Sequence, residues 1–380
     1  MERAWRPWAA LILPVMASED SEFVIVGAGL LGLATAAALT RRGRQVTVLE
    51  QATVGHPGAG SKGSCRIFRL GYPDPEYVAL ARQARQFWAE LEHTHETQFL
   101  SPVPQLTFGP ELDSIHQAML AAGAPCELLP AAEVARRFPG AAVPGPVLHE
   151  PGSSVIDADA ALRALAAAVP ALREHTRVTG LRDDGRRVTV RTDDGPIGCR
   201  AVIVCAGPWT AGLLGTAGLS LPSAATQEQV GYLDLTGGAV PDLPILIEYG
   251  GRVFYGLPVP GAPRYKAGLH HGGPAADPDQ QDHGQDPALA DDLAGFLRRR
   301  LPGLASCPVS YERCIYDNSP DEDFVIGRIG NVVIGSGTSG HGFKFGPLVG
   351  EWLAALATRE ALRPQIPHRF SPRRFSSDSW

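Results

Sequence analysis

Three lysines stand out because the chain otherwise carries arginine where it places a positive side chain. Among 34 lysines and arginines, the only lysines are Lys62, Lys266 and Lys344. An ammonium is a compact charge with three rotatable donors, and its pKa shifts readily on burial. Each of the three lies in a segment typical of a turn or strand that forms a site. The pattern favours positions where a guanidinium will not serve, with chance and compositional bias as the alternative.

A glycine motif near the start of the chain predicts dinucleotide binding. Gly27, Gly29 and Gly32 follow an apolar run at residues 23–26 and precede an alanine-rich segment typical of a helix, and a second apolar run ends at Glu50. Such glycines let the backbone approach a pyrophosphate, and the helix N-terminus offers N–H groups to it. The acid can accept hydrogen bonds from ribose hydroxyls. The motif leaves the choice between NAD and FAD open, with a coincidental glycine turn as the alternative.

A second glycine-rich turn lies near the other end of the chain. Residues 332–334 are typical of a buried strand, residues 335–342 hold the glycines, and an apolar helix pattern follows. A nicotinamide cofactor needs only one such turn, whereas a flavin also needs its ring end to be held. A helix N-terminus near the flavin would stabilise the negative charge that appears on reduction. The turn favours a flavin, with an ordinary strand-to-helix connection as the alternative.

The remaining periodicity predicts further helices and strands. We expect a helix from about residue 74, with Pro75 in its first turn and an apolar stripe in the core. Asp157 is expected to cap a helix over residues 158–169. Residues 226–270 alternate like antiparallel strands, and residues 274–287 are typical of a surface loop. Other strands are expected at residues 46–49, 106–108, 188–191 and 201–204, and a short helix at residues 131–138.

The cysteines, and the histidines His271 and His283, show no spacing typical of a metal site or a disulfide framework. None of the six cysteines forms a C-x-x-C pair, so we expect reduced thiols. His271 and His283 lack the spacing of metal ligands. No metal site is predicted.

Several segments together resemble the monomeric sarcosine oxidase family, which includes N-methyltryptophan oxidase and L-pipecolate oxidase within the D-amino-acid-oxidase-like flavoproteins. The resemblance runs from about residue 23 to about residue 370. Its most specific parts are the stretch around Cys314 and the stretch around Lys344. The segments that carry it are residues 314–324, 339–345, 66–69, 206–209 and 255–258, and Lys266 with His270.

This resemblance implies that FAD is bound covalently through its 8α-methyl group to a cysteine, which here matches Cys314; a buried free thiol is the alternative. Arg66 matches a residue packed against the flavin ring. The cofactor residues expected from the resemblance and the glycine turns are Gly27, Gly29, Gly32, Glu50, Ser61, Lys62, Arg66, Val178, Gly207, Trp209, Cys314, Gly340, His341, Gly342, Phe343 and Lys344.

The resemblance also implies how an amino acid would be held. Lys344 and Arg69 match the pair that binds the substrate carboxylate. Lys266 matches the lysine that promotes flavin reoxidation by O₂, since a fixed positive charge would stabilise the negative charge that develops; a structural ion pair is its alternative. The residues expected to act in catalysis are Lys266, His270, Tyr255, Tyr316 and Arg66.

Three positions depart from the family pattern. Lys62 stands where relatives commonly carry histidine, Thr338 replaces a common aromatic residue, and Gly327 replaces a common acid. These differences leave the expectation of FAD intact and the identity of the substrate open.

We therefore predict an FAD-dependent oxidase of a secondary amino acid, either N-methyl or cyclic. A hydride would pass from the C–H next to the amine to the flavin, the imine would hydrolyse, and O₂ would reoxidise the flavin to give H₂O₂. Sarcosine, N-methyltryptophan, L-pipecolate, L-proline and a specialised pathway intermediate stay open as substrates. The alternatives are an amine dehydrogenase with another electron acceptor, a specialised-pathway oxidase, a flavin-binding module and an NAD-dependent reductase.

The length of 380 residues predicts two or three domains. The expected fold class is α/β: an FAD-binding Rossmann-like domain of the glutathione-reductase type, with a second α+β substrate domain on a mostly antiparallel sheet. The FAD domain is expected to be discontinuous. Its expected parts are residues 21–100, 150–225 and 315–365, with the substrate domain at residues 101–149 and 226–314, an unstructured leader at 1–20 and a tail at 366–380.

Composition limits the classes of partner. A net charge of −6 favours neither nucleic acid nor an anionic membrane, and 44% hydrophobic with 19% charged residues is ordinary for a globular protein. We expect a cytoplasmic monomer whose partners are a small secondary amino acid and O₂. The first 15 residues faintly resemble a signal peptide, with a start at Met16 as the alternative.

Overall fold

The computed structural model describes residues 20–235, 242–304, 309–361 and 364–375. The expected leader lies outside these residues except for Asp20, and the expected tail is described only as far as residue 375. Among the described residues, no helix is both long enough and apolar enough to cross a bilayer.

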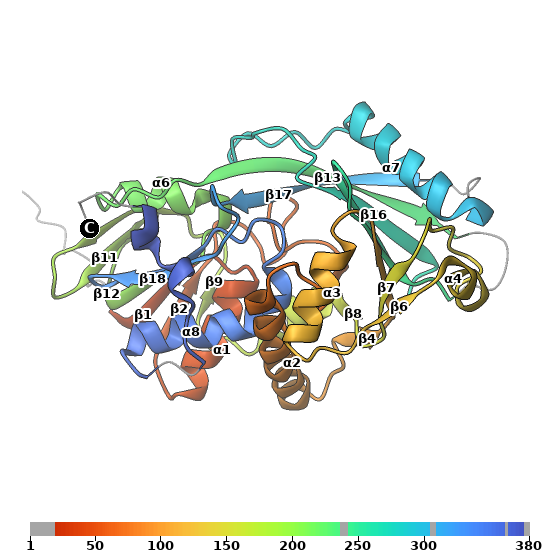
Figure 1. Ribbon diagram of the computed structural model, residues 1–380. Helices are drawn as coiled ribbons and strands as arrows, with labels where there is room; N and C mark the ends of the chain where they lie inside the picture. Colours follow the sequence, from red (N-terminus) through yellow and green to blue (C-terminus); the bar gives the residue numbers. More distant parts are fainter. Residues whose placement is uncertain (1–19, 236–241, 305–308, 362–363, 376–380) are drawn as a thin grey trace, which may run out of the picture.

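A mainly parallel sheet forms one half of the molecule (Figure 1). Its path runs β10-β11-β12-β1-β2-β9, and β19 pairs with β12 and with β18. Residues of β1 alternate between two cores, Phe23 and Ile25 toward the long helices, Val24 and Val26 toward the opposite face. The strands are β1 (Ser21–Val26), β2 (Val46–Leu49), β9 (Leu172–Arg173), β10 (Val178–Asp183), β11 (Val188–Thr192), β12 (Gly195–Val204), β18 (Val325–Ile329) and β19 (Val332–Ser336).

Helices cover both faces of this sheet. On one face α1 packs against α8 and α5, and α2 packs on α8; on the other face lies α6. Asp74 caps α2, at the predicted helix start, by accepting a hydrogen bond from the Glu76 N–H. Asp157 caps α5 by accepting one from the Ala160 N–H, as predicted. The helices are α1 (Leu30–Arg41), α2 (Pro75–His95), α3 (Leu112–Ala121), α5 (Ala158–Ala167), α6 (Thr210–Gly215) and α8 (Gly346–Thr358).

A second sheet of eight strands forms the other half, and its long strands β13 and β17 reach across toward the first sheet (Figure 1). Its neighbours are antiparallel except for the parallel pair of β14 and β5. In order across the sheet the strands are β17 (Val309–Asn318), β13 (Ala224–Asp234), β16 (Arg264–His270), β15 (Val253–Pro258), β14 (Ile245–Glu248), β5 (Gln105–Phe108), β7 (Val147–Glu150) and β6 (Glu127–Leu129).

Two helices and a small sheet complete this half. α7 (Pro287–Arg300) lies on the outer face, where Phe296 stacks on Phe254 with ring centroids 5.3 Å apart. α4 (Ala131–Arg137) packs into the same core. A three-stranded sheet of β3 (Cys65–Phe68), β8 (Ser154–Asp157) and β4 (Leu100–Pro102) connects the halves.

The predicted α/β fold class is confirmed, with two differences in detail. Residues 226–270 do contain antiparallel strands, but β13 lies between β16 and β17 and does not pair with β14, so they are not a simple meander. The helix α7 was not predicted from the sequence, although Asp286 and Pro287 give it a capping residue and a first-turn proline.

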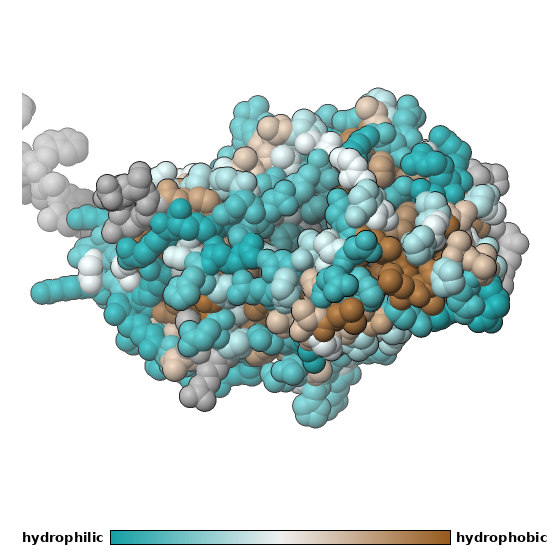
Figure 2. Space-filling model, in the orientation of Figure 1, coloured by the Kyte–Doolittle hydropathy of each residue, from teal (hydrophilic) through white to brown (hydrophobic). Residues whose placement is uncertain are grey.

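The surface in Figure 2 is mainly hydrophilic. Apolar residues gather on one side, in the region where Figure 1 places α3, β6 and β7. Leu120 on α3 and Leu128 on β6 are the exposed large hydrophobic residues among those described.

Candidate active site

One cavity gathers nearly all of the residues proposed from the sequence. Its volume is about 750 Å³, and it lies between the C-terminal ends of the parallel strands and the inner face of the second sheet. Such strand ends are where open α/β sheets bind ligands. Every residue proposed above for catalysis, carboxylate binding or FAD binding lines the cavity, except Gly32.

Gly32 acts through the backbone packing of the first glycine turn. A Cβ at this position would lie 1.9 Å from the carbonyl oxygen of Gly27, which no side chain tolerates. Gly27 itself has φ of +98° and lies against the carbonyl of Cys205. The two glycines therefore allow α1 to begin directly beside β1 and β12.

The N-terminal end of α1 is open to an anion. Gly29 is the N-cap and supplies no side-chain cap, and no acidic residue lies in the first turn. The hydroxyl of Ser61 accepts a hydrogen bond from the Leu30 N–H at 3.1 Å. Glu50, at the end of β2, accepts hydrogen bonds from the N–H groups of Ala28 at 2.8 Å and Ala52 at 3.1 Å, which fixes its carboxylate at the cavity. This end suits a pyrophosphate and a ribose.

The second sheet supplies the other end of the cavity. Cys314 and Tyr316 are two residues apart on β17, so their side chains share one face of the strand. Lys266 and His270 share a face of β16 in the same way. Tyr255, on β15, pairs across the sheet with Gly268 of β16.

Two glycines make room for the two tyrosines. A Cβ at Gly268 would lie 2.3 Å from the Tyr255 ring, and a Cβ at Gly340 would lie 2.1 Å from the Tyr316 ring. The rings of both tyrosines therefore lie across glycine backbone. The two phenol groups also lie close enough to affect each other's pKa.

Lys266 is a buried cation at this end of the cavity. Its ammonium donates a hydrogen bond to the carbonyl oxygen of Cys65 at 3.1 Å and lies 5.7 Å from the centre of the Tyr232 ring. Burial and the nearby Arg66 guanidinium lower its pKa. Burial raises the pKa of the Cys314 thiol, while Lys266 and Arg66 partly oppose that rise. Two cations beside a buried thiol favour its thiolate more than an apolar wall would.

A second cationic pair lies at the opposite side of the same region. The Lys344 ammonium donates hydrogen bonds to the Tyr72 hydroxyl at 2.8 Å and to the His341 carbonyl oxygen at 3.0 Å. The Arg69 guanidinium lies 4.4 Å from the centre of the Tyr72 ring. Burial and Arg69 lower the pKa of Lys344 well below its usual value. The carboxylate of Glu150 accepts hydrogen bonds from the N–H groups just after Arg69.

The polar groups between these two cationic regions are neutral at physiological pH. Burial, with His271, Arg69 and Lys344, lowers the pKa of His270 to about 3. Burial raises the pKa of Tyr255 and of Tyr316 above the ordinary phenol value. The site therefore offers fixed positive charge at its sides and uncharged hydrogen-bonding groups between them.

Some residues of this site were missed by sequence reasoning. Tyr72 follows the Arg66–Arg69 segment by a few residues, and that closeness was a usable signal. Glu150 and Tyr249 come from distant segments, and their contact with Arg69 depends on how the strands pair. Of the expected cysteines, Cys307 lies outside the described residues.

The sequence from residue 22 to residue 356 matches the family model described as DAO, FAD dependent oxidoreductase. The chain belongs to this family. It is thus an FAD-dependent amino acid oxidase of the DAO and sarcosine oxidase type, which acts on CH–NH bonds, and the choice between NAD and FAD is decided for FAD.

Relatives of this family align over most of the chain. Peroxisomal sarcosine oxidase of Mus musculus is 32% identical over 358 residues, covering 88% of this chain and 92% of its own. Monomeric sarcosine oxidase of Bacillus sp. (strain B-0618) is 31% identical over 361 residues, covering 90% and 93%. Among solved structures, NikD, an unusual amino acid oxidase essential for nikkomycin biosynthesis, in its open form, has a TM-score of 0.82 at 26% identity, covering 93% of this chain and 98% of its own.

The residues of the cavity fit FAD. The open N-terminus of α1 suits the pyrophosphate, and Glu50 suits the ribose. The second glycine turn places Gly340 and Gly342 on the wall of the same cavity, so one continuous space joins both turns. One cavity therefore offers binding groups for both ends of FAD, the pyrophosphate end and the flavin ring end.

Proposed function

We propose that this enzyme oxidises a secondary amino acid, N-methyl or cyclic, and uses O₂ as electron acceptor. The observation that carries the proposal is that Arg69 and Lys344 both line the cavity, beside His270, whose lowered pKa keeps its ring neutral. The chemistry supplied by FAD when bound is removal of a hydride from the C–H next to the amine and delivery of the electrons to O₂, giving H₂O₂.

Arg69 and Lys344 bind the substrate carboxylate in this proposal. The Lys344 ammonium has three donors, of which Tyr72 and His341 take two, which leaves one for a ligand. Arg69 is held against the Tyr72 ring and faces Glu150, which also acts on Lys344. The two cations therefore stay in place without a substrate, and a carboxylate gains two charge-assisted partners at no cost of rearrangement.

His270, Tyr255 and Tyr316 surround the amine in this proposal. Two fixed cations nearby favour the neutral form of a substrate amine over its ammonium form, because like charges repel. A histidine with a pKa of about 3 is too weak a base to take the amine proton at neutral pH. We therefore assign His270 the part of a hydrogen-bonding group that orients the amine.

Lys266 is assigned to the reaction with O₂. Its ammonium is buried, and a buried positive charge stabilises negative charge on a nearby oxygen more strongly than an exposed one does. Cys314 is proposed as the covalent attachment point of FAD, since its thiol lines the cavity beside two cations. The monomeric state, by analogy with the Bacillus relative, and a cytoplasmic location belong to the same proposal.

A second candidate is an oxidase of a biosynthetic intermediate. It is favoured by the similarity in structure to NikD, whose described role is in nikkomycin biosynthesis. The same carboxylate-binding pair would serve such a substrate.

The test is oxygen consumption and H₂O₂ formation with sarcosine, N-methyltryptophan, L-pipecolate and L-proline, each against the matching primary amino acid where one exists. H₂O₂ formed in step with O₂ uptake from a secondary amino acid supports the proposal. Reduction of a dye without O₂ uptake would show a dehydrogenase instead. Turnover of the primary amino acids alone would reject the assigned substrate class.

A further inference from the structure

Three potential metal ligands meet at the edge of the cavity. The ligand atoms of His270, His271 and Glu322 all lie within 4.8 Å of one another. We propose that these three side chains bind a divalent transition-metal ion of the Zn²⁺ type and that the bound ion restricts access to the substrate end of the cavity. This inference goes beyond the proposed function, and its main test needs no amine substrate.

The histidines are available as ligands. Their ring centroids are 4.1 Å apart, and within the described part of the chain no hydrogen bond is formed to a ring nitrogen of either histidine. The nearest polar approach joins His271 Nε2 and Glu322 Oε1 at 3.6 Å, beyond hydrogen-bond range. Imidazole and carboxylate ligands suit Zn²⁺, and three protein ligands leave one position for water.

The strand end that carries the histidines is held rigidly. His270 is the last residue of β16, and the Glu228 carboxylate accepts hydrogen bonds from the N–H groups of Gly272 and Gly273 at 2.9 and 2.8 Å. Glu228 is itself buried on β13. The turn that presents His271 is therefore fixed before any ion binds, which lowers the entropy cost of binding.

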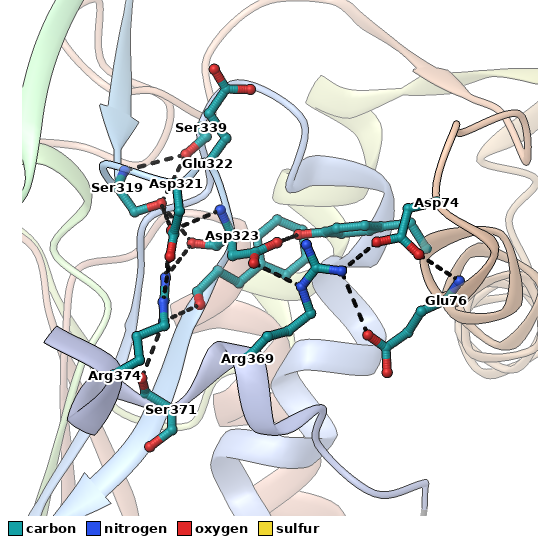
Figure 3. Close-up of polar contacts among 12 residues, drawn as sticks. Asp74, Glu76, Ser319, Asp321, Glu322, Asp323, Ser339, Arg369, Ser371 and Arg374 are labelled. Atoms are coloured by element: carbon teal, nitrogen blue, oxygen red, sulfur yellow. Dashed lines mark hydrogen bonds and ion pairs between the residues drawn. The ribbon is translucent and has the colours of Figure 1, made fainter. Parts of the chain in front are cut away.

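The loop that carries Glu322 is also fixed. The ring of His341 donates a hydrogen bond to the Glu322 carbonyl oxygen at 3.1 Å. The acids on either side are bound by Arg374 and Arg369, and Figure 3 shows the Glu322 carboxylate directed away from both arginines. The Glu322 side chain is 62% exposed, so its carboxylate can reach an ion without losing a hydrogen bond.

Two of the three proposed ligands have an unusual backbone conformation. His271 has φ of +54° and Glu322 has φ of +60°, the left-handed region that favours glycine. Residues other than glycine stay in this left-handed conformation only when surrounding contacts fix them, and such positions cluster at ligand sites.

The charges around His270 limit the affinity for Zn²⁺, and the place of His270 in the cavity explains why a bound ion would restrict access. Arg69 and Lys344 place positive charge near His270, which opposes a dication, so the Glu322 carboxylate is the counter-charge that makes binding favourable. His270 lines the substrate end of the cavity. An ion that holds its ring nitrogen would remove it from the substrate and narrow the entrance.

The test is calorimetric titration of the purified full chain with zinc chloride at neutral pH. We expect one Zn²⁺ site, and we expect His271→Ala to lower its affinity for Zn²⁺ by about 100-fold or more. Loss of a residue that only hydrogen-bonds to a metal ligand typically lowers metal affinity by about 10–100-fold, and His271 is proposed as a ligand itself. The exposed His283, outside the cluster, gives the matched control, and His283→Ala should bind as the unchanged chain does. Should His271→Ala fold poorly, the exposed Glu322→Gln carries the same expectation.

Two results would overturn the proposal. One is a dissociation constant weaker than about 1 mM for the unchanged chain. The other is binding that neither His271→Ala nor Glu322→Gln weakens. The effect on access has its own readout: Zn²⁺ should lower kcat/KM of the unchanged enzyme for any amine that it oxidises and should leave His271→Ala unaffected. Binding without such inhibition would reject the placement at the entrance.

Discussion

Gly268→Ala tests whether the position of the Tyr255 ring matters for turnover. The added methyl group would lie 2.3 Å from the ring, whereas ordinary contact begins at 3.4 Å, so the ring must move by about 1 Å. A displacement of that size at a reacting group costs roughly 100-fold in rate, about 2.7 kcal/mol of transition-state stabilisation. The methyl group also overpacks the site, which we expect to lower the free energy of unfolding by about 1–3 kcal/mol.

The assay compares kcat/KM, bound flavin and unfolding in urea for three forms of the enzyme. Gly215→Ala is the matched control, because a Cβ at that helical position meets nothing within 4 Å. The expected result is a fall of about 100-fold in kcat/KM for Gly268→Ala with flavin content retained, and no loss for Gly215→Ala. A Gly268→Ala enzyme with unchanged kcat/KM would show that the position of the Tyr255 ring does not matter for turnover, because the ring cannot stay where it is.

Cys314→Ser is expected to leave FAD removable by denaturation, because a serine hydroxyl forms no thioether; flavin that stays on the denatured chain would reject this attachment site. Lys266→Met should slow reoxidation by O₂ far more than anaerobic reduction by substrate, and equal slowing of both would contradict the assigned role. In the unchanged enzyme, reoxidation should slow as pH rises through the pKa of Lys266, which burial lowers below 10.5, since only the ammonium form carries the charge; Lys266→Met should abolish this pH dependence. Arg369 binds Asp323 at 2.7 Å and is 39% exposed, so Arg369→Gln should lower the free energy of unfolding in urea by about 1–2 kcal/mol. The exposed Arg299→Gln is its control and should change this free energy by less than about 0.5 kcal/mol.

Local features of the fold could be predicted because their causes lie within a few residues. The glycine turn at residues 27–32, the start of α2 at Pro75, the cap of α5 by Asp157 and the apolar stripe of α2 each depend on neighbours in the chain. The pairing of β13 with both β16 and β17 could not be predicted in this way, since it joins segments far apart in sequence.

In the candidate site, too, local motifs could be recognised from the sequence, whereas contacts between distant segments could not. The motifs around Cys314 and Lys344 identified residues that line the cavity, through resemblance and not through spacing. The approach of Glu322 to His271 could not be read from spacing, because it depends on how the turn after β16 meets the loop after β17. Gly327, which departs from the family pattern, has a structural reason: a Cβ there would lie 2.4 Å from Pro372, so glycine allows the C-terminal segment to pack against β18.

The most direct test of the proposed function is an anaerobic absorption titration of the purified enzyme with the panel of N-methyl and cyclic amino acids. Because substrate oxidation must reduce the flavin before O₂ is involved, one of these amino acids should bleach the visible flavin band. A yellow protein that none of them bleaches would contradict the assigned substrate class while leaving the family membership in place.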